Sequence, residues 1–247
     1  MYMNQRRYVL LDTIRGFSLV SMILYHAIWD IVYIFGVDMP WYKSQMAYIW
    51  QQSICQTFIL LSGFCWHFGR RKLKRGLIVF GCSVVISLVT IFFMPDSLIL
   101  FGVLSLIGSA MLVMIPLDKI LKKANPYVGA VVCLLLFLLT KSINSGTIGL
   151  GNLFSITISD ALYTNMFTAY LGFPPEDFFS CDYFGIFPWI FLFQTGYFLY
   201  YCLQKKQLLE KLPDISILPL AWLGRHSLVA YMLHQPVVYG VLFFVFG

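Results

Sequence analysis

The sequence predicts an all-α polytopic membrane protein, a helix bundle of about seven transmembrane helices with a cytoplasmic N-terminus. Three observations lead to this fold class. First, 60% of the 247 residues are hydrophobic and 11% are charged, less than half of the roughly 25% of charged residues in soluble domains. Second, several apolar runs reach the roughly 20 residues that cross a bilayer core. Third, the basic residues gather in alternate connections between these runs.

Seven apolar runs are long enough to be transmembrane helices. They comprise residues about 15–36, 46–66, 76–94, 98–117, 126–143, 184–203 and 226–246. Together they predict a single membrane-embedded domain over residues 1–247. The first run is too long for the core of a signal peptide and lacks a small-residue cleavage site, so we expect it to be retained as a helix.

The stretch from Ser145 to Tyr183 is long for a connection and could contain an eighth span. Asp160, Asn165 and several glycines interrupt its apolar part. An eighth span would also move the basic residues of the next connection to the outer side of the membrane. We therefore expect a loop with an interfacial or re-entrant helix here.

Basic residues gather at the N-terminus and in the second, fourth and sixth connections. They are Arg6, Arg7, Arg70, Arg71, Lys72, Lys74, Arg75, Lys119, Lys122, Lys123, Lys205, Lys206 and Lys211. The positive-inside rule then places the N-terminus in the cytoplasm and the C-terminus outside. The formal net charge of +6 is thus a topology signal. Membrane lipids are the expected surroundings, and no nucleic-acid partner is predicted.

The six cysteines are scattered and mostly lie inside apolar runs. They are Cys55, Cys65, Cys82, Cys133, Cys181 and Cys202, and no two of them form a CxxC pair. This spacing favours thiols that pack in the protein interior over a disulfide framework or a zinc site. The sequence predicts no metal site.

Ionisable side chains lie deep inside the first and last runs. His26 lies eleven residues past Arg15, hence about 16 Å along a helix and near the midplane of a ~30 Å core. Asp30 is one turn further outward on the same face. In the last run His234 lies nine residues past Arg225, hence about 13 Å deep. The two histidines are therefore predicted to reach similar depths.

Simpler explanations exist for each of these polar residues. A lone histidine in a membrane helix often only hydrogen-bonds across helices, but a buried Asp costs about 2.5–3.5 kcal/mol on insertion scales. A His–Asp pair with a second histidine at matched depth therefore favours a functional cavity. Asp12 can cap the first helix, and Arg15 can reach the lipid headgroups. Asp182 stands at the outer mouth of the sixth run, where Trp189 suits either the interfacial aromatic belt or stacking against a sugar.

Five stretches of the chain carry a resemblance to a known family. They read "LLDTIRGFSLVSMILYHAIWD", "FILLSGFCW", "ILFGVLSLIG", "FFSCDYFGIFPWIF" and "LGRHSLVAYMLHQPVVYG". In this order and rough spacing they resemble bacterial proteins of the heparan-alpha-glucosaminide N-acetyltransferase catalytic-domain family, within the transmembrane acyltransferases. The resemblance runs from Arg7 to about Tyr239. Its most specific parts are the opening D-x-x-R-G and closing S-L-x-x-Y-x-x-H-Q-P patterns taken together.

The resemblance implies an acyltransferase of the bacterial cell membrane. Such an enzyme would move an acetyl group from cytoplasmic acetyl-CoA, its co-substrate, to an amine or hydroxyl of an envelope glycan. Cationic side chains at the cytoplasmic mouth would hold the CoA phosphates. The candidate substrate-binding residues are Asp12, Arg15, Arg71, Arg225, Asp182 and Trp189. The CoA thioester and the glycan are thus the expected partners, and a homodimer is a further partner that the sequence leaves open.

Acyl transfer from a thioester needs a base for the acceptor and stabilisation of an oxyanion. We expect His26 to be the general base and Asp30 to hold the tautomer of its imidazole. His234 would donate to the oxyanion or carry the acetyl group covalently. The animal branch of the family has Asn at the position of His26, so these roles rest on the residues of this chain. A proton-coupled transporter or a non-catalytic family member are the alternative functions.

Overall fold

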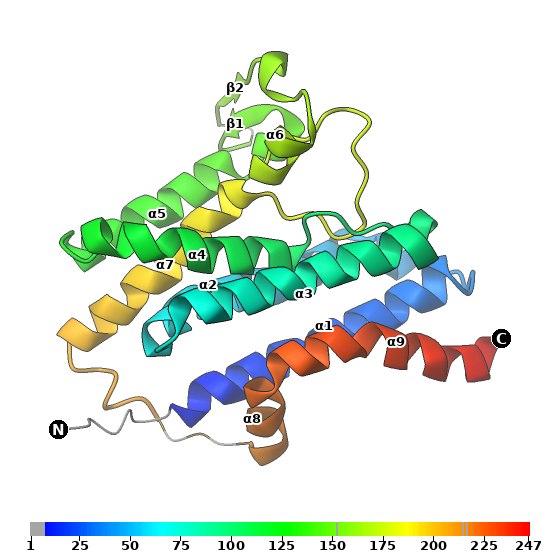
Figure 1. Cartoon of the computed structure of the whole chain (residues 1–247), viewed down its shortest axis with the longest axis horizontal. Helices are drawn as coiled ribbons and strands as arrows, with labels where there is room; N and C mark the ends of the chain where they lie inside the picture. Colours follow the sequence, from blue (N-terminus) through cyan, green and yellow to red (C-terminus); the bar gives the residue numbers. More distant parts are fainter. Residues whose placement is uncertain (1–7, 152, 214, 216) are drawn as a thin grey trace. The chain divides into compact units, whose positions relative to one another are not determined.

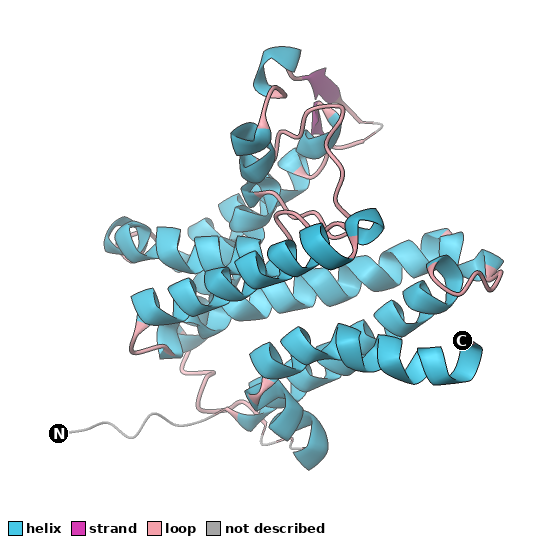
Figure 2. Ribbon diagram, turned by 45° about the vertical axis from the view of Figure 1, so that its right-hand side comes forward, coloured by secondary structure: helices cyan, strands magenta, loops and turns pink. Residues whose placement is uncertain are grey.

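The structure is a computed structural model that describes residues 8–151, 153–213, 215 and 217–247 (Figure 1). Helices make up nearly all of its regular structure, and the only strands of the described part are two short ones (Figure 2). The predicted all-α class is therefore confirmed. Arg6 and Arg7, which entered the orientation argument, lie outside the described residues.

Seven long helices of the described chain match the seven predicted runs in order. They are α1 (Val9–Tyr33), α2 (Gln45–Cys65), α3 (Lys72–Phe93), α4 (Val103–Leu121), α5 (Pro126–Thr140), α7 (Ile186–Lys205) and α9 (Ser227–Phe246). Six of them are long and apolar enough to cross a membrane, so the chain is a multi-pass integral membrane protein. The exception, α2, has 21 residues, but its four glutamines lower its hydropathy. The count of seven spans and the cytoplasmic N-terminus stay predictions.

Short elements fill the connections. They are η1 (Pro40–Lys43), η2 (Trp66–Phe68), η3 (Pro95–Ser97), η4 (Ile143–Ser145), β1 (Thr147–Gly149), β2 (Ser155–Thr157), η5 (Asp160–Leu162), α6 (Met166–Leu171) and α8 (Leu218–Arg225). The strands β1 and β2 pair antiparallel with Ile148 opposite Ile156. Between residues 145 and 183 the longest described helix, α6, has six residues. The described part of this stretch thus has short elements only, as expected for a loop, and the interfacial or re-entrant position of its helix stays a prediction. The helix α8 was not predicted.

The chain divides into two compact units. The first comprises Met1–Phe58 and Leu208–Gly247, and the second comprises Ile59–Gln207. The first unit therefore joins the two ends of the chain, with α1, α8, α9 and the first part of α2. The single membrane-embedded domain over residues 1–247 stays a prediction.

In the first unit, two glycines let α1 and α8 pack backbone against backbone. A Cβ atom on Gly16 would lie 1.9 Å from the carbonyl oxygen of Leu220, and one on Gly224 would lie 1.9 Å from that of Asp12. Real Cβ atoms cannot approach so closely, and only glycine leaves the space. The helix α9 also packs against α1 (Figure 1). These contacts place the polar residues of α1 beside those of α8 and α9.

In the second unit, α3 packs on α4 and α5 packs on α7. Gly63 of α2 and Gly196 of α7 allow these two helices to approach closely. A Cβ atom on Gly63 would lie 1.9 Å from the carbonyl oxygen of Phe193, and one on Gly196 would lie 2.0 Å from that of Leu60. The interior is apolar and aromatic, and it includes the fully buried side chains of Phe193 and Tyr197. This unit carries the predicted residues Arg71, Asp182 and Trp189.

Candidate functional site

Two histidines meet between α1 and α9. The ring centroids of His26 and His234 lie 4.9 Å apart in an edge-to-face arrangement with an interplanar angle of 78°. Depth counted independently from Arg15 and from Arg225 predicted similar depths for the two rings, and the contact between them agrees with that prediction. Asp30 and Gln235 complete the cluster, since Gln235 Nε2 donates a hydrogen bond of 2.6 Å to Asp30 Oδ1.

Backbone carbonyls fix the tautomers of both rings. His26 Nδ1 lies 2.9 Å from the carbonyl oxygen of Met22, and His234 Nδ1 lies 2.5 Å from that of Tyr231. A carbonyl oxygen only accepts, so each Nδ1 carries a hydrogen and donates it. In the neutral rings Nε2 then bears a lone pair on both histidines. Each ring is thereby set up to accept a proton or to attack an electrophile.

The predicted role of Asp30 as the group that holds the His26 tautomer is wrong. The Met22 carbonyl does this instead, because it lies one turn back on the same helix and within reach of Nδ1. Asp30 is fully buried and accepts from Gln235. Gln235 was not predicted as a site residue. Its position directly after His234 and before Pro236, which cannot donate a backbone hydrogen bond, was the signal that could have identified it.

Three polar atoms of this cluster are buried and have no hydrogen-bond partner among the described residues. They are Asp30 Oδ2, His234 Nε2 and Gln235 Oε1, named here the open trio. A buried polar atom without a partner costs about 1–3 kcal/mol, and most such atoms in native proteins are satisfied by protein or water. The open trio therefore marks a place where a polar ligand or water belongs.

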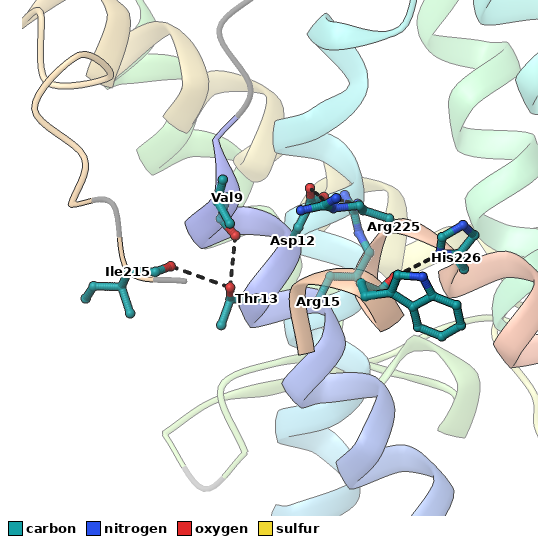
Figure 3. Close-up of polar contacts among 8 residues, drawn as sticks. Val9, Asp12, Thr13, Arg15, Ile215, Arg225 and His226 are labelled. Carbon is teal, nitrogen blue, oxygen red and sulfur yellow. Dashed lines mark hydrogen bonds and ion pairs between the residues drawn. The ribbon is translucent and has the colours of Figure 1, made fainter. Parts of the chain in front are cut away.

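A second polar cluster lies where α1 meets α8 (Figure 3). Asp12 pairs with Arg15 across 3.6 Å and with Arg225 across 3.7 Å. One carboxylate between two guanidinium groups leaves one positive charge in excess. The alternative role of Asp12 as the helix cap is wrong, because α1 begins at Val9 and Tyr8 occupies the capping position. Asp12 instead lies in the first turn and links α1 to the end of α8.

The hydroxyl of Thr13 adds a further link in the same region (Figure 3). It donates to the carbonyl oxygen of Val9 at 3.0 Å and lies 3.5 Å from that of Ile215. The segment before α8 is thereby held against the first turns of α1. These contacts therefore fix the backbone that carries Arg15 and Arg225.

The three predicted residues of the second unit occupy separate places. Arg71 is exposed and directly precedes α3. Asp182 Oδ2 accepts a hydrogen bond of 3.4 Å from the backbone N–H of Val103, at the start of α4. Because residues 94–102 form a short connection between α3 and α4, Arg71 and Asp182 lie at opposite ends of this helix pair. Trp189 is only 7% exposed and packs against other aromatic rings.

The burial of Trp189 changes the interpretation of its ring. Its centroid lies 5.3 Å from that of Phe137 and 5.0 Å from that of Phe184. Tilted contacts at these separations are typical of aromatic packing in a core. A ring with this little exposed surface offers a sugar no face for stacking, so the structure gives Trp189 a packing role.

Removal of the Asp182 carboxylate should destabilise the second unit. A carboxylate at a helix start satisfies a free N–H group and interacts favourably with the helix dipole, so Asp182→Ala is expected to cost about 1 kcal/mol. Thermal unfolding of the purified variant in detergent measures this loss, and Asp177→Ala, which removes an exposed acidic side chain from the same loop, is the matched control. Equal melting temperatures for the two variants would contradict the prediction.

His67 is a partly buried histidine that was not predicted as a functional residue. Its ring stacks on Tyr200 with centroids 4.1 Å apart, and its Nε2–H donates to the carbonyl oxygen of Tyr197 at 3.3 Å. Burial, helped by the charge of Lys72, lowers the pKa of His67 to about 4 from an ordinary value of 6.5. The ring is therefore neutral in the folded protein and serves packing.

The depressed pKa of His67 predicts a loss of stability in acid. Between pH 6.5 and pH 4 the unfolded chain takes up a proton at His67 and the folded chain does not, so falling pH favours unfolding. The loss should reach up to about 3 kcal/mol. Thermal unfolding measured across this pH range should show a shallower decline for His67→Phe, which keeps the aromatic stack. Identical pH profiles for both proteins would refute this origin.

No group of three or more His, Cys, Asp or Glu side chains in the described part of the chain is placed to hold a metal ion. The cluster between α1 and α9 offers four polar groups of its own. These are two histidine lone pairs, a buried carboxylate and a carboxamide, which suit proton transfer and nucleophilic attack.

Comparisons with known proteins identify the family. Curated proteins and solved structures give no match to this chain. The family model described as heparan-alpha-glucosaminide N-acetyltransferase, catalytic, matches residues 7–236, which include both histidines of the α1–α9 cluster. The match covers most of the chain and agrees with a multi-pass membrane protein that acts as a transferase of the acetyltransferase type. The chain therefore belongs to the heparan-alpha-glucosaminide N-acetyltransferase catalytic-domain family.

Proposed function

We propose that this protein moves an acetyl group from cytoplasmic acetyl-CoA to an amine or hydroxyl of an envelope glycan, in the bacterial cell membrane. The observation that carries the proposal is the contact between His26 and His234, in which each ring has its Nδ1 hydrogen engaged and its Nε2 lone pair available. Membership of the family supports acetyl transfer as the reaction.

The proposed reaction uses His26 as the general base. Its Nε2 takes a proton from the acceptor amine or hydroxyl as that group attacks the thioester carbonyl. The tetrahedral intermediate then expels the CoA thiolate, which takes up a proton from the imidazolium or from water. A well-placed general base contributes about 100- to 10,000-fold to such a reaction.

The tautomer of His234 distinguishes between its two proposed roles, donor to the oxyanion and covalent carrier of the acetyl group. A donor to the oxyanion needs a hydrogen on Nε2, but the hydrogen of the neutral ring is on Nδ1, where it meets the Tyr231 carbonyl. The lone pair on Nε2 favours the covalent alternative, in which His234 attacks the thioester carbon, the C–S bond breaks and CoA leaves as a thiolate. The acceptor would then attack the acyl-imidazole and restore the free ring.

The donor would bind at the end of the first unit that carries Arg15 and Arg225. Both guanidinium groups pair with Asp12, and the excess positive charge suits the phosphates of CoA, which guanidinium groups bind in bidentate fashion. Arg71, exposed before α3, is a further candidate for these phosphates. Asp182 stays a candidate for the glycan at the start of α4, and a homodimer stays a prediction.

Single-turnover transfer with radiolabelled acetyl-CoA tests the proposal. The purified protein in detergent is mixed with labelled donor and an amino sugar, beside the His26→Ala and His234→Ala variants. Label that reaches the sugar or the protein with the wild type alone is the expected result, and labelled protein lost in His234→Ala would identify the covalent route. A folded protein that neither binds nor turns over acetyl-CoA would refute the proposal, and proton flux in liposomes would then test the transporter alternative.

A further inference from the structure

A small pocket lies at one end of the second unit, where three of its helices come together. The helix α7 packs against both α5 and α4, so the end of α4, the start of α5 and the end of α7 meet there. The pocket has a volume of about 210 Å³. Its lining residues are Lys122, Ala124, Pro126, Tyr201, Gln204 and Lys205.

The pocket gathers positive charge from two helix ends. Lys122 directly follows α4, and Lys205 is the last residue of α7. The Nζ atoms of Lys205 and Lys206 lie 5.7 Å and 5.6 Å from the ring centroid of Tyr127, so cation–π contacts hold both ammonium groups at the start of α5. Lys122 and Lys205 line the same small pocket, and a group bound inside it therefore lies within reach of both.

No acidic side chain of the described chain neutralises this charge. Both ion pairs that the structure describes lie in the first unit, and neither Asp nor Glu is among the residues that line the pocket. Asp118, in the last turn of α4, accepts a hydrogen bond of 2.7 Å from the hydroxyl of Tyr197 at its Oδ1. The start of α5 adds the positive end of a helix dipole. The pocket is therefore electropositive and suits an anion.

Five lysines in total gather where α4 and α7 end. All of them are exposed, and they are Lys119, Lys122, Lys123, Lys205 and Lys206. Clusters of four to eight basic residues next to a membrane helix attract anionic lipids, and basic pockets between membrane helices bind their headgroups. This end of the unit is also the one that the positive-inside rule predicts to face the cytoplasm. The position and the charge of the pocket thus match an anionic headgroup.

An apolar stripe on α5 begins within one turn of the pocket. Val128, Val131 and Leu135 are each more than half exposed, and their spacing places them on one face of the helix. The helix is long and apolar enough to cross a membrane, where such a stripe contacts acyl chains. A lipid whose headgroup lies in the pocket can therefore place its chains along α5, whereas a soluble phosphate makes no use of this surface.

We propose that this pocket binds the anionic phosphate group of a phospholipid headgroup. Each lysine supplies up to three donors and one positive charge, and the carboxamide of Gln204 supplies two more donors to the phosphate oxygens. The pocket is smaller than the roughly 300–1,000 Å³ of pockets that hold drug-sized ligands, which suits a headgroup phosphate better than the whole of a molecule such as CoA. The site does not depend on the proposed acyl transfer, whose two histidines belong to the first unit.

Lipid binding by the full-length protein tests the proposal. Native mass spectrometry of the protein released from detergent compares phosphatidylglycerol, which is anionic, with phosphatidylcholine of the same acyl chains, which is zwitterionic. We expect one molecule of phosphatidylglycerol to bind about 25-fold more tightly, because each ammonium group contributes about fivefold to the attraction of an anionic lipid. Equal affinity for the two lipids would overturn the proposal.

Variants separate the pocket from the general charge of this surface. Lys122→Gln and Lys205→Gln should each lower the affinity for phosphatidylglycerol about fivefold. Ala124→Phe, which fills the pocket without a change of charge, should also lower it. The matched control is Lys74→Gln, which removes an exposed lysine of α3 that does not line the pocket, and it should stay within about twofold of the wild type. Equal losses in Lys74→Gln and Lys122→Gln would contradict the assignment.

Soluble phosphates distinguish the source of the bound group. Inorganic phosphate and CoA, each added at the concentration of the lipid, should leave the bound phosphatidylglycerol in place, because they lack acyl chains for the stripe on α5. Displacement by either one would overturn the lipid as the occupant. If the lysine variants do not fold, the comparison of phosphatidylglycerol with phosphatidylcholine on the wild type still decides.

Discussion

Replacement of His26 by alanine is expected to lower the rate of acyl transfer by about 100-fold or more, because the reaction loses the base that takes the acceptor proton. The fold should be retained, since within the described part of the chain the ring hydrogen-bonds only to the carbonyl oxygen of Met22 on its own helix. Single-turnover transfer from labelled acetyl-CoA, normalised to the amount of monodisperse protein, measures the effect. An active His26→Ala protein would end the proposed mechanism.

His226→Ala is the matched control for this variant. His226 is exposed at the junction of α8 and α9, and its Nδ1 also donates to a backbone carbonyl, that of Trp222 at 2.9 Å. The substitution therefore removes the same side chain and the same kind of hydrogen bond away from the α1–α9 cluster. We expect transfer within about twofold of the wild type, on the rule that surface substitutions have small effects. Equal losses in both variants would indicate a general effect on the protein.

The second large effect is expected for the glycines between α1 and α8. Gly16→Ala and Gly224→Ala each place a Cβ atom 1.9 Å from a carbonyl oxygen of the other helix. Both partners are backbone, so relief requires the two helices to separate, at an expected cost of about 3 kcal/mol or more. Since α8 carries Arg225, the same shift should disrupt its pair with Asp12. Melting temperature and the yield of monodisperse protein in detergent report the loss.

Gly240→Ala distinguishes this steric effect from a general sensitivity of helical glycines. Gly240 lies inside α9, and a Cβ atom there would meet nothing within 4 Å. Alanine is favoured over glycine in a helix by about 0.5–1 kcal/mol, so this variant should be as stable as the wild type or slightly more stable. Equal melting temperatures for the three variants would show that the close approach of α1 and α8 does not require Gly16 and Gly224.

Most of the helical structure could be predicted from the sequence. Apolar length and the positions of basic residues depend on local composition, and they identified all seven long helices within a few residues. The errors lie at the ends, such as α1, which begins at Val9 rather than near residue 15. Polar residues such as Asp12 can belong to a helix when a partner neutralises them, and Arg225 is more than 200 residues away in the chain. The composition of the segment around Asp12 gives no information about so distant a partner.

The sequence predicted most residues of the candidate site but not the hydrogen bonds between them. A constant rise per residue made the depths of His26 and His234 accessible from two anchor residues, and the rings do meet. The hydrogen-bond pattern could not be predicted. A histidine in a helix can bond to a side chain four residues ahead or to the backbone carbonyl four residues back, and the spacing does not distinguish the two. His26 takes the carbonyl of Met22, which leaves Asp30 for Gln235. Trp189 shows the same ambiguity, since an aromatic residue at a helix start suits an interface, a sugar or a core.

The sequence by itself determined that this chain crosses the membrane several times, that two histidines and a carboxylate stand inside its apolar runs, and to which family it belongs. These properties follow from segment length, spacing and residue order, which can be read along the chain. Only the tertiary structure decided which polar atoms are satisfied and which remain open. Hydrogen bonds act over about 3 Å and here join α1 to α9, between residues 30 and 235. The chemistry of the open trio therefore became visible only once the two ends of the chain were packed together.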